Sequence, residues 1–215
     1  MKRGNGFLKK SLILIFIALF LIGIFFVLFK VDIYVVKFIE SLRNIFLDYF
    51  FIGITFLSKF FVVLFFLISL FLAKKSNRRW IIPLVLTIAL SSITGFLIKI
   101  LIKRPRPFID GSVSVLSIIF YFMKNNFNTW NFSFPSGDTI FVFCVLPIIS
   151  KEFKKFRYYW LGFAILVAFS RMYLGVHYLT DVIAGAAMGY LIGSLIVFLE
   201  EKYKFGLRLV KRIGL

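Results

Sequence analysis

The chain has 215 residues, of which 61% are hydrophobic and only 17% are charged, and its mean hydropathy is +0.97. Soluble domains typically contain about 45–50% apolar and about 25% charged residues, so this composition excludes a water-soluble globular protein. The 27 Lys and Arg residues outnumber the 9 Asp and Glu residues. Most of them lie in four clusters beside apolar runs, at residues 2–10, 74–79, 151–157 and 202–212, which is typical of membrane topology rather than of nucleic acid binding.

Apolar runs predict six membrane-spanning helices, because a helix needs about 20 apolar residues to cross a hydrocarbon core of ~30 Å. The first run is longer than the ~7–15 apolar residues of a signal peptide, so we interpret it as a retained span. With the N-terminus in the cytoplasm, six spans place all four basic clusters on the cytoplasmic side. The expected spans are residues 11–29, 50–73, 80–102, 137–150, 158–173 and 179–199.

We therefore expect an all-α polytopic protein of the cytoplasmic (inner) membrane. Residues 1–215 should form one domain, a six-helix bundle. Polar residues between 37 and 48 recur at helical spacing opposite an apolar face, which predicts an amphipathic helix at the outer interface. Residues 113–123 are too short to span and predict an interfacial or re-entrant helix.

Lys59, inside the second span, either snorkels or packs against a neighbouring helix, or contributes to the substrate path. Cys144 is the only cysteine, which excludes an intramolecular disulfide and a cysteine-ligated metal.

Three polar groups lie at the predicted outer ends of spans, and the first follows the third span. It contains Lys99 and Arg106, with two further cations between them. Lys and Arg are normally concentrated on the cytoplasmic side, so a basic group at the outer end suggests that it binds an anion. Lys99 lies within the span itself, where an amine needs a partner.

The second group, Ser136, Gly137 and Asp138, opens the fourth span. Ser136 is a suitable helix N-cap, and the free amides from Gly137 onward form an anion site at the positive end of the helix. The alternative for this segment, taken alone, is a plain helix cap.

The third group has the pattern Ser170-Arg171-x5-His177-x3-Asp181 and bridges the last two spans. His177 is the only histidine of the chain. Asp181 follows it by four residues, which places both side chains on one face of a helix. The carboxylate can therefore orient the imidazole and stabilise its cation.

Cations, neutral hydrogen-bond donors and a His–Asp pair are together the groups that phosphoryl transfer needs. Cations and amides stabilise the charge on the transferred phosphate. A histidine can act as the nucleophile and form a phosphohistidine that water hydrolyses. The sequence contains no acidic cluster suited to a metal, so we expect neither a metal nor a cofactor.

The three groups resemble the motifs of the type 2 phosphatidic acid phosphatase family of membrane lipid phosphatases, Lys-x6-Arg-Pro, Pro-Ser-Gly-His and Ser-Arg-x5-His-x3-Asp. Residues 99–107 and 170–181 match the first and third motifs in full, and residues 135–137 match the second. The resemblance implies a six-helix bundle in which His177 is the nucleophile and Asp181 is its relay partner. It also implies a phosphate-binding set, which consists of Lys99, Arg106, Ser136, Gly137 and Arg171.

Asp138 departs from the family pattern, which has at this position a histidine that protonates the leaving group. Either Asp138, desolvated beside the phosphate, serves as the acid, or the leaving group needs little protonation. A departing lipid phosphate has a second pKa of about 6, whereas a lipid alkoxide is far more basic. The second alternative favours a polyprenyl diphosphate, or an anomeric sugar phosphate such as the 1-phosphate of lipid A, over a simple glycerolipid phosphate.

We predict an integral membrane lipid phosphatase whose active site faces the periplasm or exterior and takes a phosphorylated headgroup from the outer leaflet. Lipid A 1-phosphate, undecaprenyl pyrophosphate and phosphatidylglycerophosphate are all open as substrates. A phosphotransferase, in which a second lipid attacks the phosphohistidine, is a further enzymatic alternative. A non-catalytic phosphate- or lipid-binding membrane protein is the alternative from a different class. The sequence does not predict the oligomeric state.

Overall fold

The computed structural model describes residues 20–21, 23–24, 31–73, 75–114 and 132–212. These residues form helices and contain no β-strand, apart from one isolated bridge between Pro105 and Phe132. The helices are α2 (Val31–Ser41), α3 (Ile45–Leu57), α4 (Phe60–Leu72), the 3-10 helix η1 (Lys75–Trp80), α5 (Ile81–Ile102), α7 (Gly137–Glu152), α8 (Phe156–Tyr173), α9 (Leu179–Tyr203) and α10 (Phe205–Arg212).

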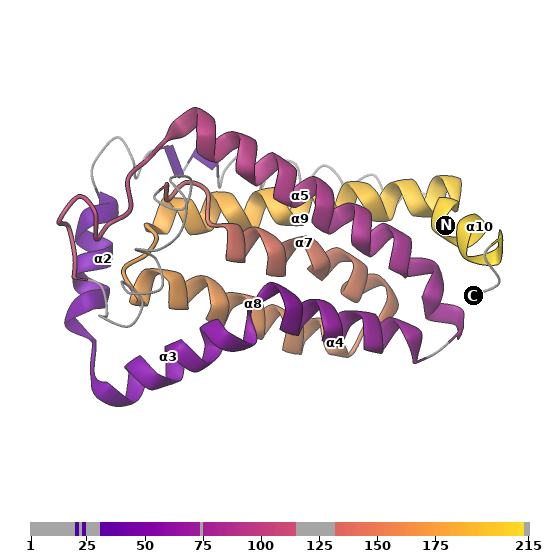
Figure 1. The fold of residues 1–215 in the computed structure, drawn as a ribbon, viewed down its shortest axis with the longest axis horizontal. Coiled ribbons are helices and arrows are strands. Elements are labelled where there is room, and N and C mark those ends of the chain that lie inside the picture. Colours follow the sequence, from indigo (N-terminus) through magenta and orange to yellow (C-terminus); the bar gives the residue numbers. More distant parts are fainter. Residues whose placement is uncertain (1–19, 22, 25–30, 74, 115–131, 213–215) are drawn as a thin grey trace.

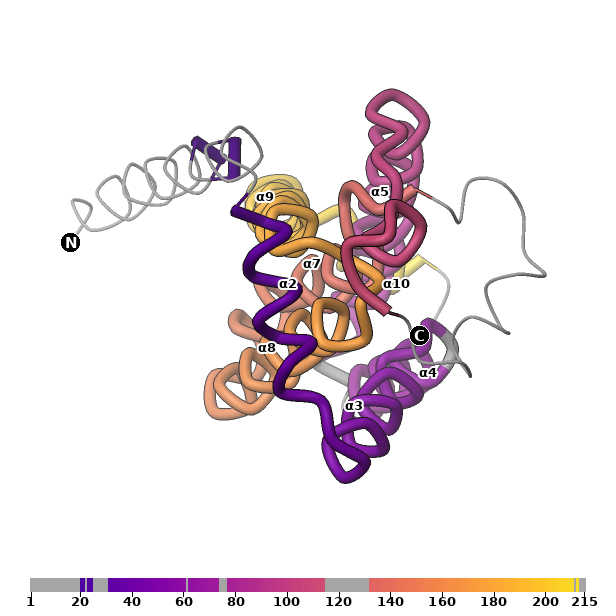
Figure 2. The backbone as a smooth tube through the Cα atoms, turned by 90° about the vertical axis from the view of Figure 1, so that its left-hand side faces the viewer, coloured from indigo at the N-terminus to yellow at the C-terminus, as the bar shows by residue number. Residues whose placement is uncertain are grey.

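Helix α7 is the centre of the bundle. It packs against α5, α8 and α9, which run beside it along the long axis of the molecule, while α2 lies across one end (Figures 1 and 2). Most of its residues are buried, and Cys144 and Val145 have no exposed surface. Because α7 has neighbours on several sides, its sequence is apolar around most of its circumference instead of along one stripe.

Glycines on one face of α9 bring its backbone against α7. A Cβ atom at Gly185 would lie 2.8 Å from the carbonyl oxygen of Ser136, and a Cβ atom at Gly189 would overlap the carbonyl oxygen of Ile140. Small residues at intervals of four allow helix backbones to approach closely in membranes. This contact fixes the start of α7 against the start of α9, where the second and third sequence motifs lie.

Replacing Gly189 by alanine is expected to destabilise the protein by about 1–3 kcal/mol, because the added methyl group overpacks the contact between α7 and α9. The thermal midpoint of the detergent-solubilised protein measures this loss. Gly162→Ala is the matched control, since a Cβ atom there meets nothing within 4 Å. It should leave the midpoint unchanged or raise it slightly, because alanine favours a helix more than glycine does. Equal midpoints for the two variants would contradict the close packing described above.

The predicted continuous span over residues 50–73 is wrong in one respect, because the chain breaks at Ser58 and Lys59. The hydroxyl group of Ser58 donates to the carbonyl oxygen of Thr55 at 2.9 Å, and the amide of Lys59 donates to Phe56 at 3.1 Å instead of continuing the α-helical pattern. A serine that bonds to nearby backbone competes with the helix in this way. The segments on either side, Ile45–Leu57 and Val62–Leu72, are bent by 53°.

The amphipathic helix predicted over residues 37–48 is two helices. Helix α2 ends at Ser41, and Asn44 then caps α3 by accepting a hydrogen bond from the amide of Leu47 at 3.0 Å. An asparagine at the N-cap starts a new helix because its side chain replaces the missing backbone acceptor. The predicted short helix over residues 113–123 lies almost entirely outside the described residues.

By length and composition, two described helical segments can cross a membrane, Asn77–Ile102 and Leu179–Tyr203, and the bent pair of α3 and α4 adds a third if it is one span. The predicted count of six is not confirmed. Helices α7 and α8 have 16 and 18 residues, and the predicted first span, residues 11–29, lies largely outside the described residues.

The basic clusters that the structure describes gather at the end of the bundle opposite α2. Helices η1 and α10 pack together there. Arg79 of η1 pairs with Glu152 at the end of α7 at 3.0 Å, and Lys151 pairs with Glu201 at the end of α9. The three sequence motifs lie at the other end.

Candidate active site

His177 lies in the turn that joins α8 to α9, and only 3% of its surface is exposed. The amides of Val176 and His177 donate to the carbonyl oxygen of Arg171 at 3.1 and 3.2 Å, which closes the turn. Gly175 has a φ of +73°, a conformation that glycine adopts without strain. The turn therefore holds the histidine directly between the end of α8 and the first turn of α9.

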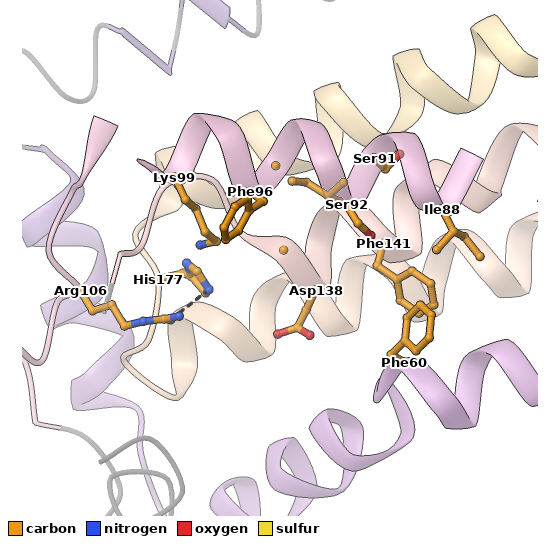
Figure 3. A pocket seen from close by; sticks show the side chains of 13 residues that line it. Phe60, Ile88, Ser91, Ser92, Phe96, Lys99, Arg106, Asp138, Phe141 and His177 are labelled. Carbon is orange, nitrogen blue, oxygen red and sulfur yellow. Dashed lines mark hydrogen bonds between the residues drawn. The ribbon is translucent and has the colours of Figure 1, made fainter. Parts of the chain in front are cut away.

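The two ring nitrogens of His177 have different neighbours. A guanidinium nitrogen of Arg106 lies 3.2 Å from Nε2 (Figure 3). Because a guanidinium group can only donate, Nε2 must accept and the proton of the neutral ring lies on Nδ1. Burial, together with the positive charges of Arg106 and Lys99, holds the pKa of His177 well below its ordinary value of 6.5. The ring is therefore neutral at pH 7.

Asp181 faces the other nitrogen. Its Oδ2 lies 3.4 Å from Nδ1 of His177, and its side chain has no exposed surface. Nδ1 makes no hydrogen bond within the described part of the chain, because 3.4 Å is longer than a normal bond of this kind. A small movement of the ring toward Asp181 would complete the bond and fix the tautomer.

Two cations of the first motif surround the histidine. Lys99, in the last turn of α5, donates from Nζ to the carbonyl oxygen of Phe132 at 2.9 Å. Arg106 donates to the carbonyl oxygen of Val176 at 2.9 Å and is 5% exposed. Burial lowers the pKa of Arg106 to about 10, so its guanidinium group still carries a positive charge at pH 7.

Ser136 occupies the N-cap position of α7, as predicted, but its side chain does not cap the helix. Its hydroxyl group instead hydrogen-bonds to the hydroxyl group of Thr139 at 2.8 Å. Its amide donates to the carbonyl oxygen of Asp181 at 3.0 Å, which ties α7 to α9. Gly137 follows with open space around its Cα, so its side of the helix start is accessible to an anion.

Arg171 and Asp138 form an ion pair that the sequence analysis did not predict. The guanidinium group of Arg171 donates to Oδ2 of Asp138 at 2.9 Å, and also to the hydroxyl groups of Ser170 and Thr55. Arg171 is buried, whereas 43% of the Asp138 side chain is exposed. Asp138, which departs from the family motif, is thus paired with Arg171, a cation of the third motif.

A cavity of about 460 Å³ opens beside these side chains. Its polar part is lined by Lys99, Arg106, Asp138 and His177, and Gly137 also faces it. Its remaining wall is largely apolar and includes aromatic rings that lie beyond Asp138 (Figure 3). The apolar lining residues are Phe60, Ile88, Gly95, Phe96, Ile140 and Phe141, with Ser91 and Ser92 among them. An anionic headgroup and an apolar chain would each find a matching surface here.

Lys59 is the N-cap residue of α4 and directly precedes the cavity residue Phe60. Its side chain is exposed, and its positive charge is near enough to stabilise the carboxylate of Asp138. This exposed position argues against burial of Lys59 against a neighbouring helix, and it fits both a snorkelling side chain and a place near the substrate path.

Residues 80–204 match the sequence model of the PAP2 superfamily, and this match covers more than half of the chain. The chain belongs to the PAP2 superfamily. This confirms the resemblance drawn from the three motifs, and it places all eight predicted site residues inside the PAP2 match. Helices α2, α3 and α4 precede the matched region.

Two curated PAP2 relatives illustrate the similarity. The chain is 40% identical over 85 residues to phosphatidylglycerophosphatase B of Bacillus subtilis, a match that covers 34% of this chain and 42% of the relative. It is 31% identical over 134 residues to undecaprenyl-diphosphatase of Sulfolobus acidocaldarius, covering 61% and 59%. The matches thus span about two fifths to three fifths of these relatives.

A solved structure has the same fold. The crystal structure of a transmembrane PAP2-type phosphatidylglycerolphosphate phosphatase from Bacillus subtilis superposes with a TM-score of 0.67 at 24% sequence identity. The match covers 91% of this chain and 97% of that chain. The fold is therefore that of a PAP2 membrane protein.

Proposed function

We propose that the protein is an integral membrane phosphatase that hydrolyses a phosphate from a lipid headgroup through a phosphohistidine on His177. The 3.2 Å contact between Arg106 and Nε2 of His177 carries this proposal, because it supports a neutral ring whose Nε2 lone pair points toward Arg106, and both residues line the cavity. The names of the two relatives, a phosphatidylglycerophosphatase and an undecaprenyl-diphosphatase, support the same class of reaction.

In the proposed first step, Nε2 of His177 attacks the phosphorus atom while the bond to the leaving oxygen breaks, and that oxygen keeps the bonding electrons. The ring becomes cationic, and Asp181 accepts the hydrogen bond from Nδ1–H and stabilises it. A water molecule then attacks the phosphohistidine, the N–P bond breaks, and inorganic phosphate leaves.

The phosphate oxygens would be held by the donors that surround His177. Arg106 would exchange its contact with Nε2 for a phosphate oxygen, and Arg171 would share its guanidinium group between Asp138 and the phosphate. Preorganised donors of this kind stabilise the charge that develops in the transition state. The full proposed set is Lys99, Arg106, Ser136, Gly137 and Arg171.

Asp138 suggests which leaving group the site accepts. In its ion pair with Arg171 the carboxylate is held in the charged form, and a charged carboxylate has no proton to donate. A leaving phosphate, with a second pKa of about 6, needs little protonation. We therefore favour a polyprenyl diphosphate or the anomeric 1-phosphate of lipid A as substrate, rather than a glycerolipid monophosphate.

Replacing Asp138 by asparagine tests this preference. With farnesyl diphosphate as substrate, kcat is expected to change by less than about tenfold, since a general acid normally contributes about 10²-fold or more. KM should fall, because Arg171 is then free to bind the phosphate. A loss of about 10²-fold or more in kcat would instead identify Asp138 as the general acid.

We further propose that the active site faces the periplasm or exterior of the cytoplasmic (inner) membrane, in a six-span bundle. The described basic clusters lie at the opposite end of the molecule, and Lys and Arg favour the cytoplasmic side. A phosphorylated lipid of the outer leaflet would then reach the cavity from the membrane.

Release of inorganic phosphate by the purified full-length chain tests the function. Undecaprenyl diphosphate, lipid A, phosphatidylglycerophosphate and phosphatidic acid should be compared in the presence of a chelator. We expect release from the diphosphate or from lipid A. Transfer of the phosphate to a second lipid without release would identify a phosphotransferase, and no reaction with any lipid would favour a binding protein.

A further inference from the structure

Arg104 connects three polar residues behind the proposed nucleophile. One of its terminal nitrogens donates to Oδ1 of Asp181 at 2.9 Å and to the hydroxyl oxygen of Thr180 at 2.6 Å. The other donates to Oδ2 of Asp32 at 2.8 Å. The guanidinium plane lies over the ring of Tyr178, 3.8 Å from its centroid. The side chain is 19% exposed, and both carboxylates that it binds are buried.

The two oxygens of Asp181 have separate partners. Arg104 holds Oδ1, whereas Oδ2 accepts the amide of Tyr178 at 2.8 Å and faces Nδ1 of His177. A carboxylate that is bonded through both oxygens cannot rotate freely. The contact with Arg104 therefore determines which oxygen faces the histidine.

Asp32 holds Arg104 in turn. It is 1% exposed, and it also accepts the amide of Thr180 at 3.1 Å and the hydroxyl group of the same residue. A buried carboxylate needs such partners. The hydrogen bonds to Asp32, Thr180 and Asp181 direct the guanidinium group of Arg104 toward α2 and α9. Arg104 does not line the cavity.

We propose that Arg104 is a positioning residue of the active site: anchored by Asp32, it aligns the Asp181 carboxylate with His177. The inference rests on the proposed function, and it makes α2, which precedes the PAP2 match, a part of the catalytic unit. It also separates the two arginines of the first motif. Arg106 faces the cavity and the nucleophile, whereas Arg104 supports the relay from behind.

Steady-state hydrolysis of farnesyl diphosphate by the full-length protein in detergent tests this role. Arg104→Gln is expected to lower kcat by about 10- to 100-fold, as the loss of a group that orients a directly acting residue commonly does. KM and inhibition by inorganic phosphate should stay within about threefold, because Arg104 does not contact the substrate. Arg104→Lys, which keeps the charge and one contact, should recover part of the loss.

Asp32→Asn is expected to lower kcat in the same direction, and the double variant should lose less than the product of the two single effects, because Asp32 acts partly through Arg104 and partly through its own contact with Thr180. Arg79→Gln is the matched control. It breaks an arginine–carboxylate pair of 3.0 Å at the opposite end of the bundle and should leave kcat unchanged. Thermal midpoints identify variants that fail to fold. If Arg104→Gln does not fold, the kcat of Arg104→Lys is compared with that of the wild-type protein instead.

The results distinguish this inference from the proposed function. An unchanged kcat in Arg104→Gln, or a large rise of KM alone, overturns the positioning role while wild-type activity keeps the function intact. A wild-type protein that hydrolyses neither farnesyl diphosphate nor any of the four lipids compared above overturns both.

Discussion

The His177→Ala variant is expected to lose at least about 10³-fold in kcat for every lipid that the wild-type protein hydrolyses, since removing a covalent nucleophile abolishes the chemical route. Its affinity for inorganic phosphate should persist, because the cations that surround the cavity remain. Phosphate release measures the first quantity, and stabilisation of the protein by phosphate measures the second.

Two controls make this result specific. Because His177 is the only histidine of the chain, an acid-labile phosphoenzyme trapped with labelled substrate must vanish in the variant. A His177→Gly variant should regain some activity when imidazole is added, since imidazole can occupy the vacated space. Undiminished phosphate release by either variant would rule out a histidine nucleophile.

Arg171→Lys is expected to lower kcat/KM by about 10²–10³-fold, the usual effect of removing one preorganised donor from a transition state. Lysine keeps the positive charge but cannot reproduce the planar fork that reaches Asp138, Ser170 and Thr55 together. The measurement is phosphate release as a function of substrate concentration.

Arg157→Lys is the matched control, because Arg157 lies in the first turn of the same helix, at the end remote from the cavity. Its kcat/KM should equal that of the wild-type protein. If Arg171→Lys also left kcat/KM unchanged, Arg171 would serve only to pair with Asp138, and the phosphate-binding set would be smaller than proposed.

The sequence predicted those parts of the site whose geometry is local. His177 and Asp181 lie four residues apart and come within 3.4 Å, although His177 lies in the turn before α9 and not on the same helical face as predicted. Lys99 lies in the last turn of α5 and Arg106 follows shortly after its end, and the apolar sequence of this helix predicted its position. In each case the spacing along the chain determines the spacing in the fold.

The remaining parts depend on contacts between distant segments. Asp32 is 148 residues from Thr180 along the chain, and only the position of α2 across the end of the bundle joins them. The ion pair of Asp138 with Arg171 likewise depends on the packing of α7 beside α8. The break in the helix at Ser58 was not predicted, because hydropathy is averaged over a window of residues. Such an average does not detect a single hydrogen bond from a side chain to the backbone.

The glycine contact between α7 and α9 holds one side of the active site tightly, whereas part of the apolar wall lies outside this contact. Gly185 and Gly189 fix the helix start that carries Ser136 and Gly137 against the helix that carries Asp181, so larger residues cannot enter that contact. The opposite wall of the cavity includes Phe60 of α4 and Phe96 of α5, which lie outside this contact. Substitutions at Phe60 and Phe96 can therefore reshape the apolar wall of the cavity while the glycine contact keeps Ser136 and Gly137 beside Asp181.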